Sequence, residues 1–492
     1  MIKTLSGLLG TKPNKAWTQQ LEKRGAHPVS LLIAAVVGCL GYVGTLSGGL
    51  LVVVMSGVIL YEFVKRMDQG LPLMQVTALL AVLQWLVGPW LAYHIDLDYF
   101  IYFMRVDSAT YFSFAIPGTA AFVIGLLAVG VSVRQRALIC NMDRTQFVQL
   151  GIILGILGLM GGIAGKLLPG GLAFVFFLVS QLRYVAALYF VFSGHPLRWV
   201  LAGASVLPLF TGSAETGLFH HLLLWMGILG CYWYALRRRK LWTTIVTLIF
   251  ELAAVFIIQG IKKGYRDKVW NEEKGSLTQE IGDFLATPHA MFSRETLSNA
   301  VVRINQGWII SAVLQNVPSS EPYAMGDTVG DAVLAALIPR LVVEDKASAG
   351  GRESFRRFTG LPIADSTSMG ISLLGEAYAN LGPVGGILVM LLFGGFMSLG
   401  YGFCLVWSVK HPTFYFWIPV IFCQSIKAET DLVTVLNHIT KGSLVVFGMY
   451  WLICIQLLPA ARARKTAGLR ILPRPASRFG KHRLAEKLRV ES

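Results

Sequence analysis

The chain has 492 residues, of which 54% are hydrophobic and 14% are charged, and its mean hydropathy is +0.60. Soluble domains carry charge on about a quarter of their residues, so this composition excludes an ordinary soluble protein. The formal net charge is +16, but between residues 462 and 489 ten Lys and Arg stand against one acid. Such a local concentration indicates membrane topology rather than binding to nucleic acid.

The first segment, residues 1–28, is polar and basic, and we expect no cleaved signal peptide there. Beyond it, apolar runs of about 18 to 25 residues are long enough to cross roughly 30 Å of hydrocarbon. The predicted fold is therefore an all-α polytopic membrane protein with about 12 transmembrane helices. The expected helices are 29–45, 48–64, 73–94, 110–132, 147–164, 170–192, 197–210, 216–236, 241–261, 384–408, 413–426 and 442–460. The seventh and eleventh are short enough to be tilted, kinked or re-entrant.

Basic clusters along this series predict its orientation. With a cytoplasmic N-terminus, all of them fall on the inner side: 62–66, 134–144, 237–240, 409–412 and the tail. Cytoplasmic connections carry an excess of Lys and Arg, so both termini are predicted to be cytoplasmic. The expected divisions are an inner segment 1–28, helices one to nine in 29–261, a large outer loop 262–383, helices ten to twelve in 384–460 and a basic tail 461–492.

The loop 262–383 is far longer than the connections of about two to eight residues that are usual between bundle helices. Its composition is not that of a disordered segment, because 297–317 and 330–341 carry apolar residues at helical spacing. We therefore expect ordered helices in the loop, packed against the mouth of the bundle.

One charge lies deep inside a predicted membrane helix. Arg183 stands well within 170–192, and a charge at mid-membrane costs roughly 2.5 to 3.5 kcal/mol on the insertion scale. Two interpretations stay open, a place on a substrate path and a structural ion pair with Glu251 of helix 241–261.

Further charges recur on the predicted outer side: Arg266, Arg303, Arg340, Lys346, Glu429 and Asp431. Scattered charges are typical of a solvated loop, and that interpretation stays open. However, Arg266 and Arg340 flank apolar runs at the membrane boundary, and guanidinium groups bind phosphate oxygens through paired hydrogen bonds. A phosphate-containing ligand is the alternative.

The motifs of nucleotide hydrolysis, zinc hydrolysis and Ser-hydrolase chemistry are absent from the sequence. The six cysteines lie in or beside apolar runs without metal-ligand spacing, and His220 and His221 are adjacent rather than one helical turn apart. The sequence therefore predicts neither a metal site nor a cofactor.

Five short motifs follow in order: GYR at 264–266, RIN at 303–305, IPR at 338–340 with DK at 345–346, GEAYANLGPVGG at 375–386 and KAETDL at 427–432. Within the helical frame they resemble the Wzy-type oligosaccharide repeat-unit polymerases of O-antigen and exopolysaccharide synthesis. The resemblance in motifs covers roughly 262–441, and the first 240 residues share only the architecture. One departure is DKAS after IPR, where such polymerases often have KP, which puts the shape of that turn in doubt.

The resemblance implies a multi-pass, GT-C-like glycosyltransferase at the outer leaflet of a bacterial inner membrane. Such an enzyme joins a growing glycan on undecaprenyl pyrophosphate to one newly flipped lipid-linked repeat. The implied partners are these lipid-linked oligosaccharides, the membrane lipid, a chain-length regulator and a flippase. It implies no nucleotide sugar and no required metal.

Site residues follow from this chemistry. The expected catalytic residues are Glu376, Arg340 and Arg303, and the expected substrate-binding residues are Arg266, Arg183, Lys346, Tyr378, Glu429, Asp431 and Trp308. The arginines would stabilise the leaving pyrophosphate. Glu376 would be the general base, with Glu429 or Asp431 as the alternative, and Tyr378 or Trp308 would stack on a sugar ring. The other interpretation of Glu376 is a carboxylate that complements a helix dipole.

Three other classes stay open. An O-antigen ligase has a similar layout, a transporter of lipid-linked glycan would use polar residues along a path through the membrane, and a scaffold would need none of these charges. The concentration of polar chemistry on one side favours a transferase.

Overall fold

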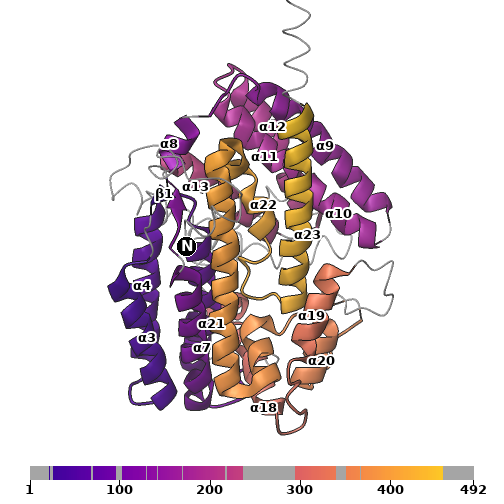
Figure 1. Cartoon of the computed structure of the whole chain (residues 1–492). Coiled ribbons are helices and arrows are strands. Elements are labelled where there is room, and N and C mark those ends of the chain that lie inside the picture. The colour runs from indigo at the N-terminus through magenta and orange to yellow at the C-terminus, as the bar shows by residue number, and fades with distance from the viewer. Residues whose placement is uncertain are drawn as a thin grey trace, which may run out of the picture. The chain divides into compact units, whose positions relative to one another are not determined.

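The computed structural model describes residues 21–22, 26–67, 70–95, 102–128, 130–133, 135–140, 142–168, 170–216, 219–236, 294–338, 351–365 and 367–457 (Figure 1). The predicted helix 241–261 with Glu251 lies outside these residues, as do Arg266, Arg340, Lys346 and the basic tail. The chain divides into two compact units, Met1–Ser443 and Leu444–Ser492.

The described residues are almost entirely helical. The first helices are α3 (Pro28–Val43), α4 (Gly48–Met67), α5 (Leu73–Val82) with the π-helical turn η1 (Leu83–Val87) and α6 (Gly88–His94), α7 (Ser108–Ala128), α8 (Gln135–Cys140), α9 (Phe147–Leu167), α10 (Gly170–Ser180), α11 (Leu182–Phe192), α12 (Arg198–Thr216) and α13 (His220–Leu236). The later helices are α17 (Arg294–Ile304), α18 (Gly307–Asn316), α19 (Asp327–Leu337), α20 (Arg352–Thr359), α21 (Ser372–Lys410), η2 (Pro412–Phe416), α22 (Ile418–Phe422), α23 (Leu432–Tyr450) and η3 (Trp451–Leu457). A two-residue strand β1 (Leu21–Glu22) pairs antiparallel with β2 (Ser132–Val133).

Seven helices in the described part of the chain are long and apolar enough to cross a membrane. They are Gly48–Met67, Leu73–His94, Ser108–Ala128, Phe147–Leu167, Leu172–Phe192, Ser372–Lys410 and Leu432–Leu457, and Pro28–Val43 and Pro412–Phe422 are shorter apolar helices. The prediction of a helical membrane protein is thereby confirmed, and the total of twelve helices stays a prediction.

Helices α3, α4, α7 and α21 lie side by side in Figure 1. Among the long apolar helices of the described residues, α7 is the most enclosed, since 83% of its most apolar stretch is buried. Glycines allow α7 and α21 to approach closely. A Cβ on Gly394 of α21 would lie 2.5 Å from the Phe122 carbonyl oxygen of α7, and a Cβ on Gly125 would overlap the Leu391 carbonyl. The two backbones are therefore in direct contact at this crossing.

We expect Gly394→Val to lower the thermal stability of the purified protein, because the added side chain forces α7 and α21 apart at an overpacking cost of about 1 to 3 kcal/mol. The measurement is the thermal midpoint in detergent by intrinsic fluorescence. Gly395→Val is the matched control, since a Cβ there meets no atom within 4 Å. Equal midpoints for the two variants would contradict the close crossing.

The helix expected at 170–192 is two helices, α10 and α11, with a turn at Gln181. Both pack against α9, where glycine again permits close approach: a Cβ on Gly158 would lie 2.7 Å from the backbone nitrogen of Arg183. The turn and this contact together fix the position of Arg183 inside the helix group.

Helices α18 to α20 lie at the end of the bundle where α21 begins (Figure 1), and α17 packs against η1 and α6. Backbone N–H groups of Ala324 and Met325 donate to the carbonyls of Ala379 and Asn380 at 3.0 and 2.9 Å. The Asn380 amide also donates to Thr328 Oγ1 at 2.7 Å. These bonds attach the start of α19 to the first turns of α21.

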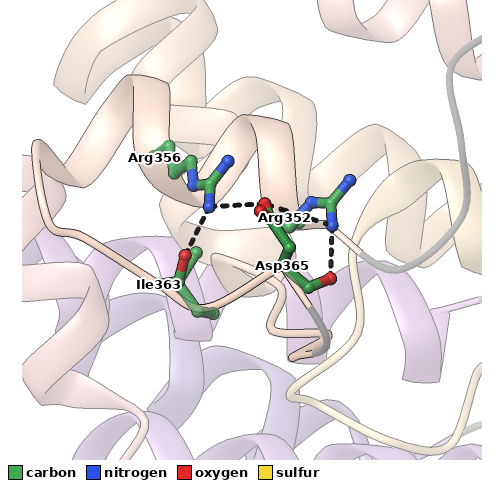
Figure 2. A network of polar contacts seen from close by, with 4 residues as sticks. All are labelled: Arg352, Arg356, Ile363 and Asp365. Carbon is green, nitrogen blue, oxygen red and sulfur yellow. Dashed lines mark hydrogen bonds and ion pairs between the residues drawn. The ribbon is translucent and has the colours of Figure 1, made fainter.

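The outward face of α20 is charged. Figure 2 shows Arg352 and Arg356 both directed at Asp365, with Arg356 Nη2 2.9 Å from its Oδ1, and both guanidinium groups also donate to backbone carbonyls. Arg357 pairs with Glu321 at 2.5 Å. Charges that pair with one another on an exposed helix face are typical of contact with water.

The chain crosses back toward the start of α21 between Lys410 and Leu432. The Leu432 N–H donates to Glu376 Oε2 at 2.8 Å, so α23 starts beside the first turns of α21. The return consists of the short apolar helix Pro412–Phe422 and the irregular segment 423–431. This crossing is therefore only half helical, and α23 starts at Leu432 where 442 was predicted.

A kink explains why α21 starts earlier than predicted. Gly382 has φ 66° and ψ −167°, outside the helical region, and Pro383 follows it. The residues Ser372–Leu381 form a separate first section that was expected to belong to the loop, and the apolar section predicted as 384–408 follows the kink.

The start of α7 shows a regular cap outside the membrane-spanning part. Asp107 accepts hydrogen bonds from Thr110 Oγ1 at 2.5 Å and from Thr110 N at 3.0 Å. These hydrogen bonds hold the pKa of the Asp107 carboxyl below its usual range.

Candidate functional site

A group of four basic side chains from separate parts of the sequence centres on His221. They are Arg183 of α11, His221 of α13, Lys427 of the irregular segment and His438 of α23, and we call them the interior basic cluster. Arg183, Lys427 and His438 are all near enough to His221 to act on its charge through space. The cluster therefore joins the α10–α13 helices to the half-helical crossing.

The turn at Gln181 positions His221. Gln181 Oε1 lies 3.0 Å from His221 Nε2 and also accepts a hydrogen bond from Trp225 Nε1 at 3.0 Å. Indole N–H only donates, so the Gln181 oxygen is the acceptor and His221 Nε2 carries the proton. The same turn places Arg183 two residues further along the chain.

Arg183 is half-buried, and its guanidinium carbon lies 5.0 Å from the centre of the Tyr184 ring. Its Nε is buried without a hydrogen-bond partner. A buried donor left unsatisfied costs about 1 to 3 kcal/mol. An acceptor-rich ligand at this position would recover that cost.

His438 is fully buried beside the end of α22. Its Nε2 lies 2.9 Å from the Val420 carbonyl and 3.2 Å from Cys423 Sγ, while its Nδ1 has no partner. Three residues further along α23, Lys441 Nζ donates to Asn437 at 2.7 Å and lies 5.7 Å from the centre of the Phe174 ring. A second basic side chain, Lys441, thus follows His438 along α23.

The backbone between α22 and α23 is irregular at a position where it touches a membrane helix. The Ala428 carbonyl accepts a hydrogen bond from Trp85 Nε1 of η1 at 3.3 Å, and η1 lies inside the apolar stretch Leu73–His94. Ser425 Oγ and Thr430 Oγ1 donate to backbone carbonyls at 2.7 Å. Irregular backbone at membrane depth occurs where it is buried in protein or lines a water-filled cavity.

Arg183 and Lys427 are the fixed cations of the interior basic cluster, and Glu251, the predicted partner of Arg183, lies outside the described residues. Neither Arg183 nor Lys427 forms an ion pair with any residue that the structure describes. Glu429 is the acid whose charge reaches Lys427, and its side chain is exposed. A cation inside a bundle is costly without a counter-charge, so the lack of an ion pair among the described residues favours a site for an anion.

The two other predicted acids hold the start of α23. Asp431 Oδ1 accepts from Thr434 N at 2.8 Å, as an N-cap residue does, and Glu376 accepts from Leu432 N. Glu376 is 3% exposed and Asp431 is 4% exposed. The Glu376 carboxylate thus lies at the positive end of a helix dipole, but the helix is α23 and not the one to which Glu376 belongs.

The aromatic residues predicted to stack on sugar face other protein groups. Trp308 is 5% exposed, with its ring centre 5.2 Å from Tyr102 and 6.2 Å from Phe355. Tyr378 lies 4.9 Å from Phe114 and 6.0 Å from Tyr323. Both rings therefore contribute to packing at the start of α21.

Of the predicted cations, the structure brings Arg183 into the interior basic cluster. Arg303 is exposed at the end of α17. Arg266, Arg340 and Lys346 lie outside the described residues. The predicted catalytic set is thus only partly described.

Sequence reasoning missed Lys427, His221, His438 and Lys441. Lys427 opens the KAETDL motif beside two acids that were singled out, and His221 was considered only as a metal ligand. A lysine directly after a short apolar run was the available signal for Lys427.

Among the described residues, no group of three or more His, Cys, Asp and Glu side chains is arranged to hold a metal ion. No family model, curated protein or solved structure matches the chain. The assignment of a function therefore rests on the chemistry of the cluster and on the motifs in the sequence.

Proposed function

We propose that the protein is a membrane glycosyltransferase that polymerises undecaprenyl-pyrophosphate-linked oligosaccharide repeats into a surface polysaccharide. The observation that carries the proposal is the interior basic cluster, whose cations lack carboxylate partners among the described residues. A diphosphate has the charge and the acceptor oxygens to bind Arg183 and Lys427, which both lie near His221. The resemblance of the sequence motifs to repeat-unit polymerases supports the same substrate.

In the proposed step, a hydroxyl of the acceptor repeat attacks the anomeric carbon of the donor glycan. A glycosidic C–O bond forms, the C–O bond to the diphosphate breaks, and the diphosphate leaves on its lipid with the electron pair. Cations fixed beside the leaving group stabilise its developing charge, which typically contributes a factor of about 10² to 10³ per group. Arg183 and Lys427 would have this role, assisted by Arg303 and Arg340.

The hydroxyl proton needs a base, and we assign that role to Glu429. Its carboxylate is exposed and lies two residues from Lys427, whereas Glu376 and Asp431 are enclosed and bound to the start of α23. A base must come within hydrogen-bonding distance of the attacking hydroxyl, and an accessible carboxylate satisfies this requirement more readily. Glu376 is then a residue that positions the segment carrying Glu429.

The proposed location is a bacterial inner membrane, with both termini in the cytoplasm and the start of α23 on the periplasmic side. The distribution of basic clusters in the sequence supports this orientation. Lipid-linked repeats become available to a polymerase on that side after they have been flipped.

A second candidate function, transport of lipid-linked glycan, is favoured by one observation. The crossing made of α22 and the irregular segment 423–431 is interrupted, and interrupted helices mark the substrate sites of many transporters. The same interruption also serves a transferase, because it exposes polar backbone beside the cations.

Surface glycan of a deletion strain separates these functions. We expect loss of the long-chain ladder on gels and accumulation of a single repeat on the surface acceptor, since one repeat can still be exported and attached. Restoration of the ladder by the intact chain is the control. Repeats trapped on the cytoplasmic side would instead support transport, and long polymer retained on the lipid carrier would support a ligase.

A further inference from the structure

The outward surface of α19 is apolar, unlike that of its neighbour α20. Val333, Leu334 and Leu337 are 42%, 54% and 67% exposed. At about 100° per residue, these three side chains and Gly330 occupy one continuous sector of the helix. The outward face of α20 carries the paired arginines seen in Figure 2.

Two other sectors complete α19. Thr328, Ala332, Ala335 and Ala336 are buried, which accounts for the side that packs on the protein. Asp327 and Asp331 are exposed and lie between the buried sector and the apolar sector. A helix with one side on protein, one apolar side and an acidic edge fits a boundary between hydrocarbon and water.

The attachment of α19 sets its depth. Met325 donates to the Asn380 carbonyl at 2.9 Å and Asn380 donates to Thr328, so the first turn of α19 lies level with Asn380. The lipid-facing stretch of α21 begins just beyond the kink, where Val384 is 65% exposed and Leu388 is 55% exposed. Four residues separate Asn380 from Val384 across the kink at Gly382, and a chain of that length spans at most about 14 Å.

We propose that α19 is an interfacial helix that inserts Val333, Leu334 and Leu337 into the acyl boundary of the membrane leaflet next to the start of α21. Interfacial helices bury their apolar face about 5 to 10 Å into that boundary, and the attachment to Asn380 holds α19 near the end of the lipid-facing stretch of α21. The occupant of the surface is bilayer lipid, because α19 is bonded to Asn380, four residues before the exposed Val384 of the membrane helix α21. This inference does not depend on the reaction that the protein catalyses.

Photo-crosslinking of the full-length chain in vesicles of phosphatidylethanolamine and phosphatidylglycerol tests the proposal. The variants are Leu334→benzoylphenylalanine on α19, Leu388→benzoylphenylalanine on α21 as the lipid-facing reference and Glu353→benzoylphenylalanine on α20 as the water-facing control. All three positions are exposed, so folding should be retained, and the elution profile of each variant checks this. Intact-protein mass spectrometry then measures the lipid adduct.

We expect the lipid adduct at position 334 to match that at 388 and to exceed that at 353 by about tenfold, since the apolar sector sits among acyl chains. A yield at 334 as low as that at 353 would overturn the proposal. Adducts at 334 to a second polypeptide, in place of lipid, would also overturn it and would assign the surface to a protein partner.

Discussion

Arg183→Ala is expected to lower the rate of glycan lengthening by about 10²- to 10³-fold, because one of the fixed charges beside the leaving diphosphate is lost. The half-buried position of Arg183, its unsatisfied Nε and its closeness to His221 are the basis for this expectation. The measurement is the rate at which purified protein extends lipid-linked repeats in detergent.

Two further arginine variants sharpen this test. Arg183→Lys keeps the charge and loses the planar fork, so we expect an intermediate rate. Arg198→Ala is the matched control, since Arg198 also lies over an aromatic ring, 5.4 Å from the centre of Trp199, but belongs to α12 and not to the cluster. A rate for Arg183→Ala equal to that of Arg198→Ala would remove Arg183 from the mechanism.

Glu376→Ala is expected to destabilise the folded protein by about 1 to 3 kcal/mol, because the buried Leu432 N–H loses its acceptor. Glu376→Gln keeps an acceptor oxygen of nearly the same shape and should retain most of the stability. The measurement is the thermal midpoint of each variant in detergent.

Variants of Glu376 and Glu429 distinguish a structural role at the start of α23 from the role of catalytic base. If Glu429 is the base, Glu429→Gln loses glycan lengthening at unchanged thermal midpoint, while Glu376→Gln retains activity. The reverse pattern, with an inactive but stable Glu376→Gln chain and an active Glu429→Gln chain, would return the base to Glu376. Both outcomes are read from the same lengthening assay.

Hydropathy was sufficient to predict the long apolar helices, because α4, α7 and α9 are each one uninterrupted run of mostly apolar residues. It failed where a crossing is only half helical. The run predicted as 413–426 ends as a helix at Phe422, and the residues after it are polar enough to be taken for an outer loop.

Contacts between distant residues were not predictable from spacing. The bond between Glu376 and Leu432 depends on how the start of α23 meets the first section of α21. The approach of Arg183 and Lys427 to His221 depends on how α11 and α13 lie beside the half-helical crossing. Arg183 was identified from its depth in an apolar run, which is a local signal. His221 lies near the start of the predicted helix 216–236 and Lys427 directly follows the predicted helix 413–426, where polar residues are ordinary. Tertiary packing gives them their position.

The most direct measurement is reconstitution of the purified chain in vesicles with undecaprenyl-pyrophosphate-linked repeats and no nucleotide sugar. The proposed function predicts longer glycans and the release of one undecaprenyl pyrophosphate for each repeat joined, with both signals reduced together by Arg183→Ala. Repeats that move across the bilayer without lengthening, or that remain unchanged in an otherwise folded preparation, would contradict it.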